Sequence, residues 1–238
     1  PHECLESRFM LQQRTLKSLT RAVGVGLHSG QRVELTLRPA APDTGIVFRR
    51  VDLPQPVDIK VAPESVCDTR MASTLSAGGD PGAPKVNTVE HLMSAFYGLG
   101  VDNALVEIDG PEMPILDGSA LPYVQAIDAV GTATCGAAKR WIKVLRSVRI
   151  EVGRAFAELR PIDRGFRLDV EIDFDSPAIG RQRFESDIDA AVFRRDIARA
   201  RTFGFTKDVE MMRANGDSLD GAKVIVSGYG NVAIYAMQ

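Results

Sequence analysis

The spacing of apolar residues changes along this chain, and that change limits the folds it can adopt. Residues 32–38 alternate strictly between polar and apolar side chains. A period of two predicts a half-buried strand. From Thr88 to Leu99 the apolar residues recur at helical spacing instead, and Asn87 or Thr88 is a suitable N-cap. Strands followed by helices in this order predict an α+β fold.

The same order starts again after a small, polar segment over residues 131–139, which predicts a linker. Two domains of similar plan are therefore expected, residues 10–135 and residues 136–238. Residues 1–9 are interpreted as a leader or a scar of upstream translation, outside the fold. Other expected elements are strands over 46–48, 103–108, 141–152, 166–174 and 222–226, helices over 120–130, 190–200 and 207–215, and an exposed loop over 76–84.

Composition excludes several classes of protein. Lys and Arg total 29 against 31 Asp and Glu, so the net charge of -2 indicates no affinity for nucleic-acid polymers. The sequence has no apolar run near the roughly 20 residues that a transmembrane helix needs. The three cysteines form no CxxC pair, so neither a disulfide framework nor a cysteine zinc site is predicted. A reducing, cytoplasmic compartment is expected.

Glu90 and His91 are the residues whose chemistry is most suggestive. They fall at the start of the predicted helix, about 100° apart around its axis, so both can reach one small site. A metal held by His91 with a water deprotonated by Glu90 is the arrangement of many zinc hydrolases. Helix capping and surface polarity are the competing explanation, and the spacing alone does not decide between them.

Several further segments widen the comparison. In chain order they are 13–17 (QRTLK), 24–30 (GVGLHSG), 88–92 (TVEHL), 100–103 (GVDN), 114–120 (PILDGSA), 176–179 (SPAI) and 198–205 (ARARTFGF). Taken in this order, over residues 13–215, they resemble the UDP-3-O-acyl-N-acetylglucosamine deacetylase family, zinc-dependent enzymes of lipid A biosynthesis in Gram-negative bacteria. Several segments in register are far more specific than any single one.

The resemblance implies a fold and a substrate. The family has two domains of similar topology, each a helix layer on a β-sheet, packed as a β-α-α-β sandwich. An insertion in the second domain forms a passage for the acyl chain. The resemblance also implies a monomer that binds a UDP-linked acylated glucosamine and removes its N-acetyl group. In this chain the second domain is expected to be incomplete.

Individual residues acquire roles through the same resemblance. Glu90 matches the general base, His91 matches one zinc ligand, and Thr202 matches a hydroxyl that stabilises the oxyanion. Asp208 matches a carboxylate that pairs with a catalytic histidine. The side chains that match substrate-binding positions are Met71, Phe203 and Asp208.

The sequence also departs from the family pattern. The family completes its zinc site with a His-Lys-x-x-x-Asp segment and supplies a further histidine as general acid, whereas no histidine follows His91 here. A catalytic zinc usually has three protein ligands. Three readings stand: an inactive fragment of an active enzyme, which the non-Met first residue favours, a frameshifted or truncated product, or a shortened paralogue that binds nucleotide-sugar and acyl chain without catalysis. His28 is expected to be satisfied polar structure, and the arginines of 194–201 a solvated helix face.

Overall fold

A computed structural model describes residues 11–176 and 179–204, and its centre is a mixed five-stranded sheet. Across the sheet the strands are β2 (Thr20–Val25), β3 (Arg32–Pro39), β9 (Ala104–Ile108), β4 (Ile46–Arg50) and β5 (Val57–Lys60). All neighbouring pairs are antiparallel except β9 and β4, which are parallel. The strands predicted over 32–38, 46–48 and 103–108 are confirmed.

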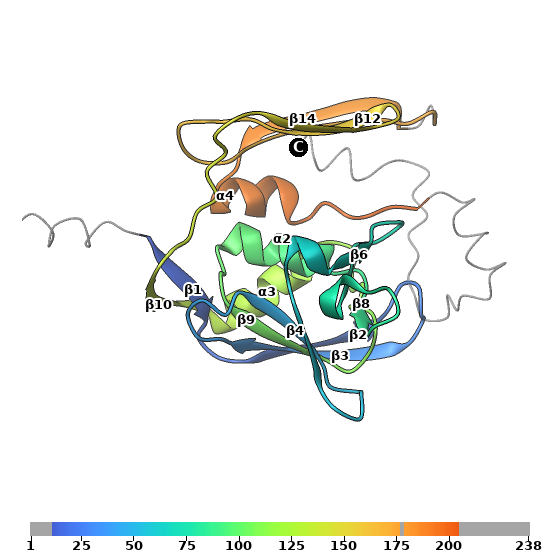
Figure 1. The fold of residues 1–238 in the computed structure, drawn as a ribbon, viewed down its shortest axis with the longest axis vertical. Helices are drawn as coiled ribbons and strands as arrows, with labels where there is room; N and C mark the ends of the chain where they lie inside the picture. Colours follow the sequence, from blue (N-terminus) through green and yellow to red (C-terminus); the bar gives the residue numbers. More distant parts are fainter. Residues whose placement is uncertain (1–10, 177–178, 205–238) are drawn as a thin grey trace, which may run out of the picture.

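The alternation in β3 places its apolar side chains in the core. Val33, Leu35 and Leu37 are each at most 2% exposed. They lie on the same side of the sheet because successive strand residues point to opposite faces. Two helices cover this sheet, α2 (Glu90–Leu99) and α3 (Leu121–Val130), and both lie on one side of it (Figure 1).

The start of α2 differs from the expectation. Its N-cap is Val89, which makes no side-chain capping hydrogen bond, so neither Asn87 nor Thr88 caps the helix. The predicted cap is wrong because Thr88 adopts a left-handed backbone, with φ of 60°, and its hydroxyl faces Glu112 instead. The end of α2 is as predicted, since Gly100 takes the left-handed conformation there with φ of 69°.

The predicted linker is also wrong. Residues Thr132–Ala138 form β10, which pairs antiparallel with β1 (Gln12–Leu16). The proposed boundary between 135 and 136 therefore falls inside a strand. The division into two domains remains a prediction.

Smaller elements flank the start of α2. A three-stranded sheet contains β6 (Val66–Asp68), β7 (Thr74–Ser76) and β8 (Lys85–Val86), and short helical turns η1 (Pro63–Ser65) and η2 (Ala77–Gly79) lie beside them. The expected exposed loop over 76–84 is confirmed only in part, because Ser76 is buried at the end of β7, Ala77–Gly79 form η2, and the exposed residues are 78 and 80–82.

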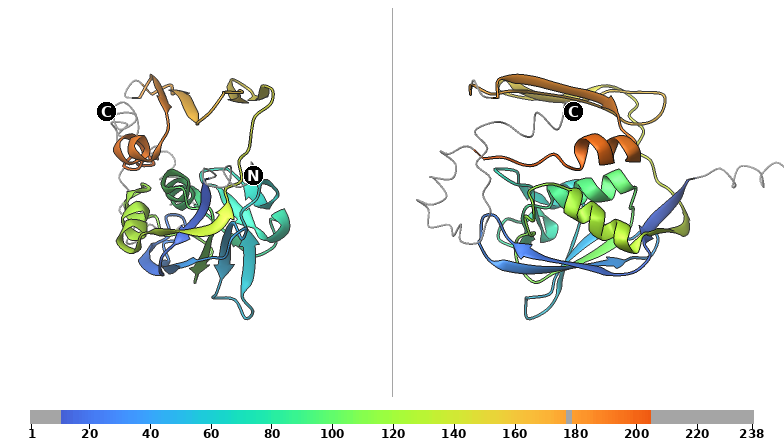
Figure 2. Two further views of the ribbon diagram at one scale, coloured as in Figure 1. Left: turned by 90° about the vertical axis from the view of Figure 1, so that its left-hand side faces the viewer. Right: turned by 180° about the vertical axis from the view of Figure 1, so that it is seen from behind.

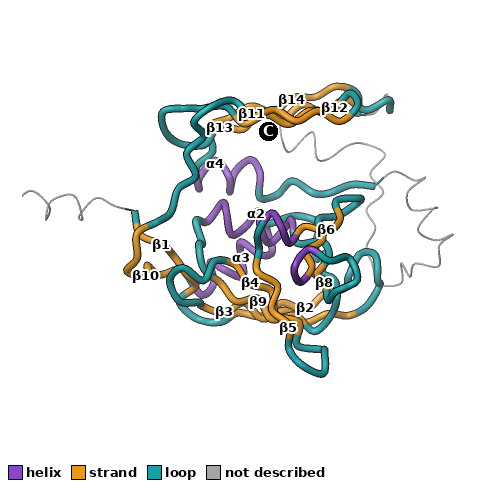
Figure 3. The backbone as a smooth tube through the Cα atoms, in the orientation of Figure 1, coloured by secondary structure: helices purple, strands orange, loops and turns teal. Residues whose placement is uncertain are grey.

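Two hairpins follow β10. The first joins β11 (Val148–Val152) to β12 (Ala155–Leu159), and the second joins β13 (Arg167–Asp173) to β14 (Arg181–Asp187). The chain then forms α4 (Ala190–Val192) and a wider helical turn, η3 (Phe193–Ile197). Figures 2 and 3 show the hairpins on the far side of α4 from α2 and α3.

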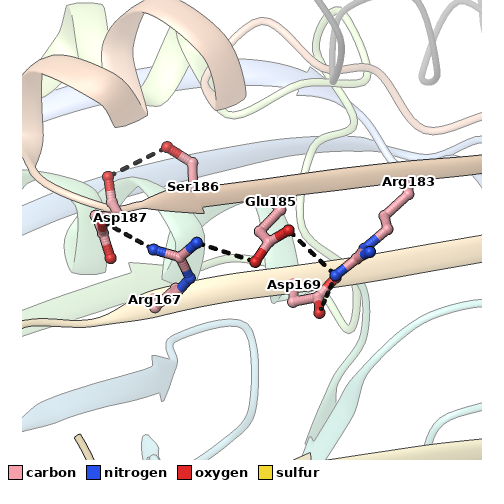
Figure 4. Close-up of polar contacts among 6 residues, drawn as sticks. All are labelled: Arg167, Asp169, Arg183, Glu185, Ser186 and Asp187. Atoms are coloured by element: carbon pink, nitrogen blue, oxygen red, sulfur yellow. Dashed lines mark hydrogen bonds and ion pairs between the residues drawn. The ribbon is translucent and has the colours of Figure 1, made fainter.

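The β13–β14 hairpin carries a ladder of ion pairs on its exposed face (Figure 4). Arg167 contacts Glu185 at 3.0 Å and Asp187 at 3.1 Å, while Arg183 contacts Asp169 at 2.7 Å. Opposite charges on neighbouring strands support the pairing of the two strands.

Side-chain contacts hold the α4 region on the helices below it. Phe193 is 2% exposed, and its ring lies against Gly98 of α2, where a Cβ would overlap the ring. Arg194 forms an ion pair with Asp128 of α3. Tyr97 and Phe166 make an edge-to-face contact with ring centroids 5.4 Å apart. The glycine is therefore needed where the ring approaches the helix backbone.

The architecture is α+β, as predicted. Similar topology in two halves, a complete β-α-α-β sandwich and an incomplete second domain remain predictions. The helix expected over 207–215 and the strand expected over 222–226 lie outside the described residues. Within the described ranges, every helix is too short or too polar to cross a membrane.

Candidate active site

Glu90 and His91 are the first two residues of α2, as predicted. The Glu90 carboxylate accepts a hydrogen bond from the backbone N–H of Ser73, with 3.0 Å between Ser73 N and Glu90 Oε2. The Ser73 carbonyl in turn accepts from the N–H of Val89 at 3.3 Å. These two bonds fasten the loop between β6 and β7 to the first turn of α2, and they orient the Glu90 carboxylate.

Backbone strain gathers around this point. Met71, in the same loop, is 62% exposed and has φ of 65°. Thr88 and Leu116 also have positive φ values, of 60° and 52°. Left-handed backbone is uncommon for residues other than glycine. It costs about 1 to 3 kcal/mol per residue and clusters at functional sites.

The His91 imidazole favours its neutral form. Burial lowers the pKa of His91, and this effect outweighs the charges of Glu90 and Asp117, which act to raise it. A neutral imidazole is the form that coordinates metals. His91 is therefore suited to be one donor to a metal.

Asp117, whose charge acts on His91, is held in a loop that Tyr123 fixes. Asp117 accepts hydrogen bonds from the N–H of Ser119 at 2.9 Å and from its hydroxyl at 2.8 Å. The hydroxyl of the buried Tyr123 donates to the Pro114 carbonyl at 2.6 Å. Burial raises the pKa of Tyr123, and the charges of Asp117 and Glu90 raise it further. Tyr123 thus stays protonated and fixes the loop that carries Asp117.

Thr202, near the C-terminal end of the described residues, contacts the loop that carries Asp117. Its backbone N–H donates to the carbonyl of Gly118 at 2.8 Å. The segment after η3 runs back across α2 to make this contact (Figure 1). The Thr202 side chain is exposed. Phe203 follows it and makes an edge-to-face contact with Phe174, with ring centroids 5.5 Å apart.

The structure thus brings most of the predicted site residues to one neighbourhood. Glu90 and His91 come from the start of α2, Met71 from the loop bonded to it, and Thr202 from the segment bonded beside Asp117. Phe203 lies one residue beyond Thr202. Asp208 lies outside the described residues. The roles assigned to these residues remain predictions.

Two residues near the site were not predicted to matter. Glu112 is a carboxylate only 2% exposed, and nothing in the local sequence marks it as buried. The expectation for His28 is wrong in one respect. Its backbone N–H is satisfied by Glu112, but its buried Nε2 has no hydrogen-bond partner among the residues described.

A complete metal site is not formed by the described residues. Within 11–176 and 179–204, no three His, Cys, Asp or Glu side chains stand close enough together to hold a metal ion. A catalytic zinc usually has three protein ligands and an open position. His91 supplies one suitable donor, so these residues alone do not fit a zinc site.

Comparison with protein families gives a match over most of the chain. The model of the family described as UDP-3-O-acyl N-acetylglycosamine deacetylase matches residues 13–230. The matched range contains every predicted site residue, and it covers far more than half of the 238-residue chain. The chain belongs to the UDP-3-O-acyl N-acetylglycosamine deacetylase family.

Proposed function

We propose that the protein hydrolyses the N-acetyl group of UDP-3-O-acyl-N-acetylglucosamine, an early reaction of lipid A biosynthesis in Gram-negative bacteria. The family match over residues 13–230 is the observation that carries this proposal. The geometry supports it, because Glu90 and His91, whose imidazole favours its neutral form, begin α2. Thr202 is bonded through its backbone to Gly118, next to the Asp117 carboxylate whose charge acts on His91.

Glu90 is the general base of the proposed reaction. It takes a proton from a water molecule as the water oxygen attacks the acetamide carbonyl carbon. The carbonyl oxygen becomes an oxyanion, and Thr202 stabilises it by donating a hydrogen bond. The C–N bond then breaks as the leaving nitrogen takes up the proton that Glu90 accepted. The acetic acid formed gives up its own proton to the amine, so acetate and the protonated amine are released. The bond from Ser73 to Glu90 supports this role because it holds one carboxylate oxygen in place.

Met71, Phe203 and Asp208 are proposed to contact the substrate. Met71 suits this role because its side chain is exposed beside the loop that orients Glu90. Phe203 suits it because it adjoins Thr202 and adds an aromatic surface. Asp208 is assigned from the family resemblance alone.

Zinc belongs to the proposal through the family. When bound, zinc would polarise the carbonyl and lower the pKa of a coordinated water. His91 is proposed as one ligand because its environment favours the neutral imidazole. The described residues supply no complete donor set, so the steps above are assigned only to the protein's own side chains.

We further propose that the protein is a cytoplasmic monomer. The free thiols of Cys67 and Cys135 are compatible with a reducing compartment. The near balance of acidic and basic residues agrees with a small-molecule substrate rather than a nucleic-acid polymer.

Acetate release from UDP-3-O-acyl-N-acetylglucosamine tests the proposal directly. A titration with UDP, carried out in parallel, measures nucleotide binding independently of the reaction. Acetate release with saturable UDP binding is the expected result. UDP binding without acetate release would instead identify a non-catalytic module for nucleotide-sugars and acyl chains, and the absence of both would remove the proposed function.

A further inference from the structure

Glu112 is a buried carboxylate that joins two parts of the candidate active site. Its Oε1 accepts from the backbone N–H of His28 at 2.8 Å, and its Oε2 accepts from that of Ser29, also at 2.8 Å. The hydroxyl of Thr88 donates to Oε1 at 3.4 Å. These three donors are two backbone N–H groups and a hydroxyl, and none of them is a lysine or arginine side chain. Both carboxylate oxygens of Glu112 are therefore satisfied by hydrogen bonds, as a buried polar group requires.

The turn that holds His28 is shaped around this carboxylate. A Cβ at Gly26 would overlap Ser29 Oγ and stand 2.5 Å from Glu112 Oε2, so a glycine is needed where the backbone passes this close to both side chains. The turn is closed by a bond from Gly30 N–H to the Gly26 carbonyl at 3.0 Å. The Nε2 atom of His28, in this same turn, is buried and has no hydrogen-bond partner within residues 11–176 and 179–204. The position of the imidazole thus depends on the position of Glu112.

Glu112 also contacts the residues just before α2, through its hydrogen bond from Thr88. Thr88 is 3% exposed and has φ of 60°, an outlying conformation for a β-branched residue. The backbone of Asn87 makes hydrogen bonds to the two neighbours of Glu112. Its N–H donates to the Pro111 carbonyl at 2.8 Å, and its carbonyl accepts from the N–H of Met113 at 3.0 Å. These contacts offset the strain at Thr88 and fix where the helix begins. Glu90 follows Thr88 by two residues, so the same contacts set the direction of its side chain.

We propose that Glu112 is a positioning residue of this enzyme, which holds the His28 turn and the strained Thr88 so that Glu90, His91 and the His28 imidazole keep fixed relative positions. It acts through other residues and does not touch the substrate. Only its effect on turnover rests on the proposed deacetylase function, because its effect on the start of α2 is structural and is measurable without substrate.

The carboxylate matters because an amide cannot replace it. Glutamine offers one acceptor oxygen and one NH₂ group, so one of the two backbone N–H groups, of His28 or Ser29, would face a donor. Leaving a buried donor unsatisfied is costly. Glu112→Gln is therefore expected to loosen the turn and the start of α2 together while changing the volume of the side chain very little.

Amide hydrogen exchange on the full chain tests this without any ligand. The informative amides are Ser73, bonded to the Glu90 carboxylate, and Met93, bonded to the Val89 carbonyl at 3.0 Å. In Glu112→Gln both should exchange about tenfold faster, the size expected when a hydrogen bond to a charged group is lost. The matched control is Glu107→Gln. It removes a carboxylate of β9 that pairs with Arg38 of β3, and it should leave the exchange rates of both amides unchanged. Unchanged protection in a folded Glu112→Gln would overturn the proposal.

A second pair of variants decides the question if Glu112→Gln does not fold. Thr88→Val removes the hydroxyl but keeps the branched side chain, whereas Thr88→Ser keeps the hydroxyl and reduces the branching. Faster exchange at Met93 in Thr88→Val but not in Thr88→Ser supports the proposal, and equal protection in the two variants contradicts it. With substrate, Glu112→Gln should lower kcat and leave KM unchanged. If the unsubstituted protein releases no acetate, the proposed function fails while the exchange data still decide the role of Glu112.

Discussion

Replacing Gly98 with alanine is expected to destabilise the protein, even though alanine is the better helix former. Gly98 lies inside α2, and its missing side chain makes room for the ring of Phe193. A Cβ at this position would overlap Cγ, Cδ1 and Cε1 of that ring. Because Phe193 is only 2% exposed, the ring has little free space into which it can move.

The magnitude follows from two opposing effects. Overpacking a well-packed site costs about 1 to 3 kcal/mol, while Gly→Ala in a helix gains about 1 kcal/mol. In the Phe193→Ala background the overlap disappears and only the gain remains. Gly98→Ala should therefore lower the free energy of unfolding by up to about 2 kcal/mol in the original protein and raise it by about 1 kcal/mol in Phe193→Ala.

Urea denaturation of the four proteins measures this cycle. The comparison requires that the free energy of unfolding falls with urea concentration at the same slope in all four proteins. A changed slope would mean that the α4 region has already detached from the folded state. Phe193→Ala alone should cost about 3 to 5 kcal/mol. If Gly98→Ala stabilises the original protein, the ring does not sit on Gly98 and the described packing of α4 on α2 is wrong.

Three further results are expected. Tyr123→Phe should cost about 1 to 3 kcal/mol in urea denaturation, because it leaves the Pro114 carbonyl buried without its donor; no loss would show that the carbonyl finds another partner. Arg50 holds the pKa of Asp52 below its ordinary value of 3.8, so this pair contributes stability above about pH 4 that is lost as the pH falls further. The free-energy difference between the original protein and Asp52→Asn should accordingly shrink between pH 7 and pH 3, and a constant difference would argue against the ion pair. Limited digestion with a protease of broad specificity should cut first within residues 140–146, which are mostly exposed and have no helix or strand; a first cut inside β10 would instead favour the linker expected from the sequence.

Local patterns were sufficient for the elements whose apolar residues are regularly spaced. The strict alternation in β3 and the helical spacing in α2 predicted both elements, because burial of one face decides each. The resemblance to the family then gave the candidate residues Glu90, His91 and Thr202. The contact between the Thr202 backbone and Gly118 joins residues far apart in the sequence, so no local pattern indicates it.

The errors have the same physical origin. β10 consists mainly of Ala and Thr and has no alternation of bulky apolar side chains. It forms a strand because it pairs with β1, which lies more than 100 residues earlier in the sequence. Thr88 resembles an N-cap by type, yet its hydroxyl bonds Glu112, a residue 24 positions away. Buried acidic residues such as Glu112 carry no sequence signature, because what satisfies them is set by the tertiary structure.

The central claim is that Glu90 removes a proton from the attacking water, and Glu90→Gln tests it most directly. Glutamine retains an oxygen that can accept from Ser73 N–H, so the loop and the start of α2 should keep their geometry, but it cannot take up the proton. The measurement compares acetate release from UDP-3-O-acyl-N-acetylglucosamine with UDP affinity in the original protein and in Glu90→Gln. Turnover should fall about a hundredfold or more with unchanged affinity, whereas turnover close to that of the original protein would contradict the assignment of Glu90 as the base.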